Sequence, residues 1–178
     1  NAMRRLKQNV KTAGFWLSRI LNYPLVCPDV IQIPVTERCN LKCRMCSIPS
    51  DFSLQKRELS KEEIFDVLGQ ARAMGIREVV LTGGEPLLRG DLFDICADSR
   101  RIGLRSIATT NGTLIDSSMA QKLASCGIGH LHFSLDGLKG SHDSVRGQGS
   151  FERTIEAIKT MDALRKKKGS GPSIGIAC

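Results

Sequence analysis

Short apolar runs alternate with longer amphipathic segments over most of the chain, and this alternation constrains the fold more than any other feature of the sequence. The short runs have the apolar, β-branched composition of strands, and we expect strands at residues 30–35, 78–81, 104–108, 130–135 and 173–177. The longer segments repeat apolar residues at helical spacing, and we expect helices at residues 60–74, 91–102, 116–126 and 150–168. Strands that alternate with helices form right-handed βαβ units. The sequence therefore predicts an α/β fold with a parallel sheet, a partial (β/α) barrel of about four and a half βα units.

The expected helix ends carry capping signals. Ser60 and Glu63 have the spacing of a capping box, in which each side chain bonds the backbone N–H of the other residue. Asp91 and Ser150 are expected to cap the helices that begin at them. The basic run at residues 165–168 suits the C-terminal end of the last helix, because cations are favoured there.

The first 29 residues differ from the rest, and they predict a basic, amphipathic helical extension (residues 1–29) ahead of the α/β part (residues 30–178). Its apolar residues recur at helical spacing beside a set of cations: Leu6, Val10, Leu17, Ile20 and Leu21, with Arg4, Arg5, Lys7, Lys11 and Arg19. We expect this helix to pack on or across one end of the barrel. A basic membrane-surface helix or a partner-docking helix is the alternative, and the stripe alone does not decide between them.

The 26 Lys and Arg residues exceed the 18 Asp and Glu residues, which gives a net charge of +8. Such charge attracts nucleic acid or anionic lipid. Here it is concentrated in the N-terminal helix and at one helix end, so a nucleic-acid partner is not expected, whereas peripheral membrane contact stays open. The sequence has neither a run of 18 uninterrupted apolar residues nor a signal-peptide pattern, and we expect a cytoplasmic protein.

Three cysteines, Cys39, Cys43 and Cys46, follow the first expected strand with the spacing C-x3-C-x2-C. They are too close together for an orderly disulfide framework, so in a reducing compartment they indicate a metal site. An iron–sulfur cube held entirely by protein takes four thiolates, whereas three leave one iron open to a small molecule. A structural zinc ion is the alternative, but it usually draws four ligands and no second cysteine pair appears. The chain has three histidines that could supply further zinc ligands, but one of them, His132, is as readily a core or barrel-lining residue as a ligand.

Polar, glycine-rich segments follow each of the first four expected strands. The cysteines follow the first, and residues 82–86, 109–112 and 134–137 follow the next three. Because the carboxyl ends of parallel strands lie at one edge of the sheet, where such folds bind ligands, we expect these segments to meet at one site.

The cysteine motif and the run Gly83-Gly84-Glu85-Pro86 together resemble the radical S-adenosylmethionine (SAM) enzymes, over roughly residues 31–178. The resemblance implies that the three cysteines hold a [4Fe–4S] cluster whose fourth iron is chelated by the amino and carboxylate groups of SAM. An electron from a flavodoxin- or ferredoxin-like donor would cleave SAM to methionine and a 5′-deoxyadenosyl radical. That radical would abstract hydrogen from a substrate that the sequence does not identify.

Barrels of this family typically have six βα units. The resemblance therefore implies that further units, and the groups that bind substrate, lie outside this chain, and that the part present here is inactive by itself. A sheet that ends at its fifth strand has an unpaired edge, and we expect self-association there.

The resemblance also assigns residues to the SAM site. Gly83 and Gly84 would let the backbone approach the ligand closely, and Glu85, followed by Pro86, would accept hydrogen bonds from the SAM amino group. Met45 stands where the family often has an aromatic residue, and it would cover the adenine through its polarizable sulfur.

Three further loops complete the expected site. Asn111 would lie near SAM or substrate, and Ser134 would contact the ribose. Asp136 would be a second ribose contact, or would only order the Asp-Gly turn. Arg146 would pair with the SAM carboxylate, with a loop contact to Asp143 as the alternative.

We therefore predict a metal-binding, SAM-dependent oxidoreductase. The motifs T-N-G, S-L-D-G and H-D-x-x-R-G resemble the branch that holds molybdenum-cofactor biosynthesis enzymes and peptide-modifying maturases. This favours cofactor biosynthesis or peptide modification without choosing between them. The alternative function is a noncatalytic iron–sulfur or SAM-binding module that docks to a membrane or a protein partner through its first helix.

Overall fold

A computed structural model describes residues 2–23, 25–48 and 57–178, and it describes residues 2–4, 7 and 8 by their backbone alone. One sheet contains five strands in the order β1-β2-β3-β4-β5, and every neighbouring pair is parallel. The strands are β1 (Val30–Thr36), β2 (Glu78–Gly83), β3 (Arg105–Thr110), β4 (His130–Ser134) and β5 (Ser173–Ala177). The predicted parallel α/β fold is confirmed.

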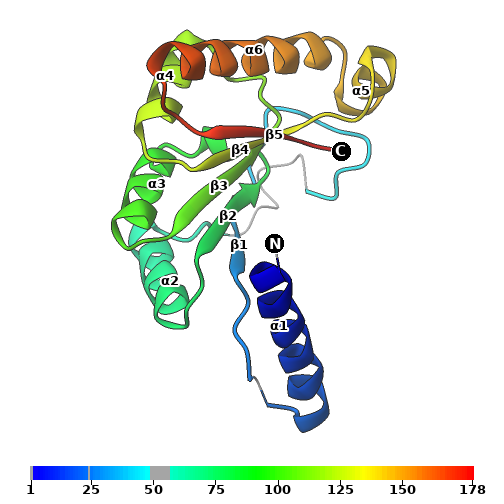
Figure 1. Cartoon of the computed structure of the whole chain (residues 1–178). Coiled ribbons are helices and arrows are strands. Elements are labelled where there is room, and N and C mark those ends of the chain that lie inside the picture. The colour runs from blue at the N-terminus through cyan, green and yellow to red at the C-terminus, as the bar shows by residue number, and fades with distance from the viewer. Residues whose placement is uncertain (1, 24, 49–56) are drawn as a thin grey trace.

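The helices that connect the strands lie along one face of the curved sheet, and the opposite face is the inside of the partial barrel (Figure 1). They are α2 (Lys61–Ala73), α3 (Leu92–Arg101), α4 (Ser117–Ser125) and α6 (Ser150–Lys168). Four complete βα units and a fifth strand follow one another, as predicted.

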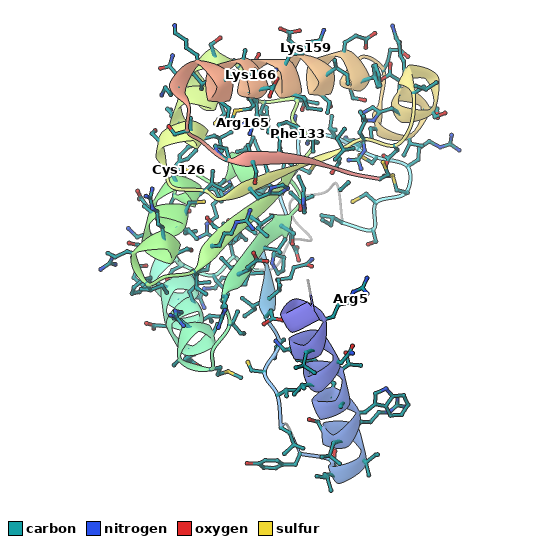
Figure 2. The ribbon with its side chains drawn as sticks, viewed as in Figure 1. Arg5, Cys126, Phe133, Lys159, Arg165 and Lys166 are labelled. Atoms are coloured by element: carbon teal, nitrogen blue, oxygen red, sulfur yellow. The ribbon has the colours of Figure 1, made fainter. Side chains whose placement is uncertain are left out.

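The core lies between the sheet and these helices because alternate strand residues point to opposite faces. In β4, Leu131 and Phe133 are fully buried on the helix side, and Phe133 faces α6 (Figure 2). The intervening His132 is half-buried and lines the barrel, with its ring 4.3 Å from that of His130 between ring centres. Of the two positions that the sequence left open for His132, core or barrel-lining, the structure shows the second.

The helix ends confirm one capping prediction and correct two. The Ser60 hydroxyl accepts a hydrogen bond from Glu63 N, and the Glu63 carboxylate accepts one from Ser60 N, as the capping box requires. Asp91 precedes α3, but its side chain makes no capping bond. Ser150 is not a cap, because α6 begins at Ser150 itself and the carboxylate of Asp143 accepts bonds from the N–H groups at its start.

Asp91 binds a buried arginine instead of the helix. The Arg89 side chain is 5% exposed, and its Nε and Nη2 lie 2.6 and 3.0 Å from the two Asp91 oxygens, while Nη1 donates to Val35 O. This bidentate pair lowers the pKa of Asp91. Removing this carboxylate would leave the buried guanidinium without its counter-charge, which costs more than breaking a surface ion pair does.

We expect Asp91→Asn to lower the free energy of unfolding by about 2 kcal/mol at pH 7, the scale of a charged hydrogen bond. Because the pKa of Asp91 is lower in the folded state, its contribution is present above the unfolded pKa of about 4 and is lost as the pH falls through the folded pKa. Urea unfolding should therefore show the same difference between the two proteins at pH 7 and pH 5, and a smaller difference at pH 3. A constant difference at all three pH values would contradict this, and Asp66→Asn on the exposed side of α2 is the control.

Two short helices were not predicted. The 3-10 helix η2 (Pro86–Leu88) follows β2, and α5 (Lys139–Arg146) follows β4. The α5 segment has few apolar residues, so helical periodicity cannot reveal it. Its contacts with α6 and with the loops of the site hold it in place instead.

The N-terminal helix α1 (Ala2–Leu21) is present, but the prediction that it packs across the barrel end is wrong for the residues that the structure describes. It projects from the sheet beside the amino end of β1 (Figure 1). Its apolar side chains remain exposed. No helix in the described parts of the chain has the length and hydropathy to span a bilayer.

β5 is the last strand of the sheet, and Ile176 on it is 57% exposed. The edge predicted from the sequence is thus where we expected it. Self-association through this edge stays a prediction.

Candidate functional site

The loops at the carboxyl ends of the first four strands line one cleft of about 230 Å³. The predicted site residues in its lining are Cys39, Cys43, Cys46, Met45, Gly83, Gly84, Asn111, Ser134 and Arg146. The structure thus brings together residues that are more than 100 positions apart along the chain, as expected for parallel strands that end at one rim.

Three predicted residues lie outside the lining, and four unassigned ones belong to it. Glu85, Pro86 and Asp136 do not line the cleft, whereas Leu41, Thr82, Thr109 and Thr110 do. Thr109 and Thr110 could have been assigned from their place at the carboxyl end of β3, directly before Asn111. Apart from its position between two of the cysteines, nothing in the sequence would have assigned Leu41 to the cleft.

The two glycines bring the cysteine loop against β2. A Cβ on Gly83 would lie 2.0 Å from Thr36 O, and one on Gly84 would lie 2.2 Å from Arg38 O. The backbone N–H groups of Gly84 and Glu85 donate to these same carbonyls, each at 2.8 Å. The space that we expected the glycines to leave for a ligand is therefore occupied in part by the main chain that leads into the cysteine loop.

Glu85 joins the loops after β2 and β3. Its side chain is fully buried, and its carboxylate accepts hydrogen bonds from Leu87 N, Thr110 Oγ1 and Asn111 N at 2.8–3.1 Å. Burial raises the pKa of this carboxyl above its usual value, against these three donors. In this structure the Glu85 carboxylate is directed to the chain, so its expected contact with the SAM amino group stays a prediction.

Asn111 connects the loop after β3 to the cysteine loop. Its Nδ2 donates to Asn40 Oδ1 at 2.9 Å, and Asn40 Nδ2 donates to Thr113 Oγ1 at 2.8 Å. On the other side of the same loop, Arg44 N donates to Val145 O of α5 at 2.9 Å. These bonds fix the position of the cysteine loop from two neighbouring loops.

Arg146 is held in the cleft by Asp136. Its Nε lies 2.5 Å from Asp136 Oδ2, and the two side chains are largely buried. The alternative prediction, a contact between Arg146 and Asp143, is wrong. The Asp143 carboxylate instead accepts hydrogen bonds from backbone N–H groups at the start of α6. Asp136 does more than order a turn, since it orients a guanidinium toward the cleft.

The three cysteines fit a cluster better than a single ion. In residues 2–23, 25–48 and 57–178 no three His, Cys, Asp or Glu side chains converge closely enough to hold one metal ion. A cube binds each of its cysteines through a different iron, so its thiolates lie further apart than the ligands of one ion. Partial burial raises the pKa of both Cys39 and Cys43, so cluster binding must displace protons from these thiols.

Fold and site together define a partial (β/α) barrel with a three-thiol cluster site at the rim of its parallel sheet. The sequence profile of the Radical SAM superfamily matches residues 33–173, and the chain belongs to this family. The family uses a [4Fe–4S] cluster and SAM, and these are the cofactors predicted from the sequence.

Curated relatives from two organisms cover the same region. The AdoMet-dependent heme synthase of Methanosarcina barkeri is 36% identical over 136 residues, which are 75% of this chain and 39% of that protein. The GTP 3′,8-cyclase of Aliarcobacter butzleri is 37% identical over 136 residues, which are 74% of this chain and 42% of that protein. The chain thus spans about two-fifths of the length of these relatives.

Solved structures share the fold. Streptococcus suis SuiB bound to its precursor peptide SuiA is 22% identical with a TM-score of 0.71, over 94% of this chain and 36% of that one. Native anSMEcpe with bound AdoMet is 24% identical with a TM-score of 0.66, over 84% of this chain and 43% of that one. At these identities the likeness concerns the fold alone.

Proposed function

We propose that this chain is the radical-generating part of a radical SAM enzyme. The observation that carries the proposal is a single cleft lined by Cys39, Cys43 and Cys46 together with Gly83, Ser134 and Arg146. When bound, the cluster supplies one electron to the SAM sulfonium, which breaks its bond to the adenosyl carbon and yields methionine and a 5′-deoxyadenosyl radical for hydrogen abstraction. The electron comes from a flavodoxin- or ferredoxin-like donor, or from dithionite in the test.

The chain's own residues bind the cluster and SAM and orient them in the cleft. Cys39, Cys43 and Cys46 would hold three irons as thiolates. Asn111 donates a hydrogen bond to this cysteine loop and Val145 O accepts one from it, and these bonds keep the loop in register with the sheet. Met45, exposed at the mouth of the cleft, covers the adenine.

Two polar side chains in the lining hold the rest of SAM. Ser134, at the end of β4, binds the ribose, and Arg146 binds the carboxylate with the guanidinium N–H groups that Asp136 does not take. Asp136 is then a positioning residue. Glu85 positions the loops after β2 and β3 from beneath the cleft.

The substrate is not part of this proposal. The relatives are named for heme synthesis, GTP cyclisation and mycofactocin maturation, and one structural neighbour holds a precursor peptide. These names favour the two classes predicted from the motifs, cofactor biosynthesis and peptide modification, and do not separate them.

Anaerobic reconstitution with iron and sulfide tests the proposal. We expect about four irons per chain. After dithionite and SAM are added to the full-length protein, we expect 5′-deoxyadenosine and methionine in equal amounts. A reconstituted full-length protein that binds SAM without forming 5′-deoxyadenosine would instead support the noncatalytic module.

We expect Arg146→Met to weaken SAM binding by roughly ten- to a hundredfold, the equivalent of one charged hydrogen-bonded pair. Isothermal titration of the anaerobic, reconstituted protein measures this. Asp136→Asn should weaken binding less, because the guanidinium remains in the cleft with its charge. Arg153→Met, on the exposed face of α6, is the matched control, and equal SAM affinity in the Arg146 and Arg153 variants would count against this role.

A further inference from the structure

Helix α1 carries a broad apolar arc that the rest of the structure leaves exposed. At 100° per residue Phe15 lies apart, whereas the other six large apolar side chains that the structure describes on this helix fall within about 140° of its circumference. They are Leu6, Val10, Trp16, Leu17, Ile20 and Leu21, and each is between 47% and 73% exposed. A helix of a soluble domain normally buries such a face against its core.

The contacts of α1 with the rest of the chain run along a different edge of the helix. Gly14 lies against Val26, so closely that a Cβ on it would be 2.6 Å from Val26 Cγ1. Ser18 Oγ accepts a hydrogen bond from Leu25 N at 2.9 Å, and Lys11 forms an ion pair with Asp29. These contacts fix α1 to residues 25–29 while the apolar arc stays open.

The charge of α1 indicates what covers this arc. The helix contains five cations, Arg4, Arg5, Lys7, Lys11 and Arg19, and no Asp or Glu. A second copy of the chain would bring two such helices together and place like charges opposite each other. An anionic lipid surface, by contrast, complements the cations and accepts the apolar arc, and Trp16 and Tyr23 are residues that favour its interfacial region.

We propose that α1 lies in the plane of an anionic membrane surface, with its apolar arc among the acyl chains and its cations at the headgroups. The helix joins the sheet at the amino end of β1, whereas the cysteine loop leaves from the carboxyl end of the same strand (Figure 1). Membrane binding and the cofactor cleft therefore use different ends of β1. The two can be tested independently of one another.

A second cationic segment of the chain provides a matched control. Lys159, Arg165 and Lys166 lie on α6, at the far end of the molecule from Arg5 on α1 (Figure 2). The apolar residues of α6, such as Ala157 and Met161, are buried in the core. Because α6 has no apolar arc to insert, its cations alone give weak, nonspecific attraction.

The experiment measures vesicle binding by co-sedimentation and by the emission of Trp16, the only tryptophan in the chain. Vesicles of phosphatidylcholine alone are compared with vesicles that contain phosphatidylglycerol at about three lipids in ten. We expect at least roughly tenfold tighter partitioning to the anionic vesicles, a blue shift of the Trp16 emission, and weaker binding as salt is raised.

The variants separate insertion from general charge attraction. The pair Leu17→Glu with Ile20→Glu, and the pair Arg5→Glu with Arg19→Glu, should each weaken binding by at least about tenfold. The control pair Arg165→Glu with Lys166→Glu should stay within about twofold. All these positions are outside the core, so circular dichroism should show the fold retained. Arg165 and Lys166 form exposed ion pairs with Asp162, so the control pair should lower the melting temperature only slightly.

An unshifted Trp16 emission with anionic vesicles would overturn the proposal. So would a control pair on α6 that loses as much binding as the α1 pairs. A chain that sediments as a dimer, and becomes a monomer when Leu17 and Ile20 are replaced by Glu, would show that a second copy covers the arc and would also overturn it.

Discussion

Replacing Cys43 with alanine is expected to reduce the iron bound after anaerobic reconstitution to near background. In the full-length protein it should lower 5′-deoxyadenosine formation by more than about 100-fold, because loss of an outer-shell partner already costs a metal site roughly 10- to 100-fold and Cys43 is a ligand. The reason is that, among the residues the structure describes, three thiols line the cleft, and two cannot retain a cube whose fourth position is already left to SAM. Iron and sulfide analysis with the absorbance of the reconstituted protein measures the loss.

The matched control for this change is Cys27→Ala. Cys27 is a half-buried free thiol between α1 and β1, outside the cysteine motif. We expect this variant to bind the same amount of iron as the parent chain. A Cys43→Ala protein that still binds four irons would mean that the cluster uses other ligands.

Gly83→Ala is expected to lower the free energy of unfolding by about 3 kcal/mol or more, because strain and overpacking act together. Gly83 has φ +133°, a conformation that side chains disfavour, and its added Cβ would lie 2.0 Å from Thr36 O. The obstructing atom belongs to the backbone of β1, so it cannot move aside without shifting the strand that leads into the cysteine loop. Cluster incorporation should fall in parallel with stability.

Gly69→Ala is the control for this loss. Gly69 lies within α2, where a Cβ would have no heavy atom within 4 Å. Alanine favours a helix interior over glycine, so this change should stabilise the protein by about 0.5–1 kcal/mol. Urea unfolding of both variants measures the contrast, and equal effects of the two substitutions would show that β1 does not press against Gly83.

The parallel sheet could be predicted from the sequence because the strands are short apolar runs, whereas the helices between them repeat apolar residues at helical spacing. The rim that collects the cysteines, Gly83, Asn111 and Ser134 follows from that topology alone. The short helix α5 could not be predicted in this way, since it is stabilised by neighbours rather than by an apolar stripe of its own. Likewise, the sequence shows that a carboxylate is available near the start of α6 but not that Asp143, instead of Ser150, reaches its N–H groups.

The direction in which a side chain points was the second feature that the sequence could not predict. The motif places Glu85 at the rim, yet its carboxylate accepts hydrogen bonds from Leu87, Thr110 and Asn111 below it. Two of these donors lie at the carboxyl end of β3, which is distant in sequence. The apolar stripe on α1 could likewise be predicted from the sequence. The surface that covers this stripe could not, because helical periodicity identifies an apolar face and not what packs against it. Both outcomes depend on tertiary contacts that local patterns do not encode.

The most direct test of the account is the electron paramagnetic resonance spectrum of the reduced cluster, recorded with and without SAM. If Cys39, Cys43 and Cys46 are its only protein ligands, SAM binds the open iron and changes the spectrum. Arg146→Met should then require higher SAM concentrations for the same change. An identical spectrum with saturating SAM, from a protein shown by titration to bind it, would contradict the claim that the fourth iron is the SAM site.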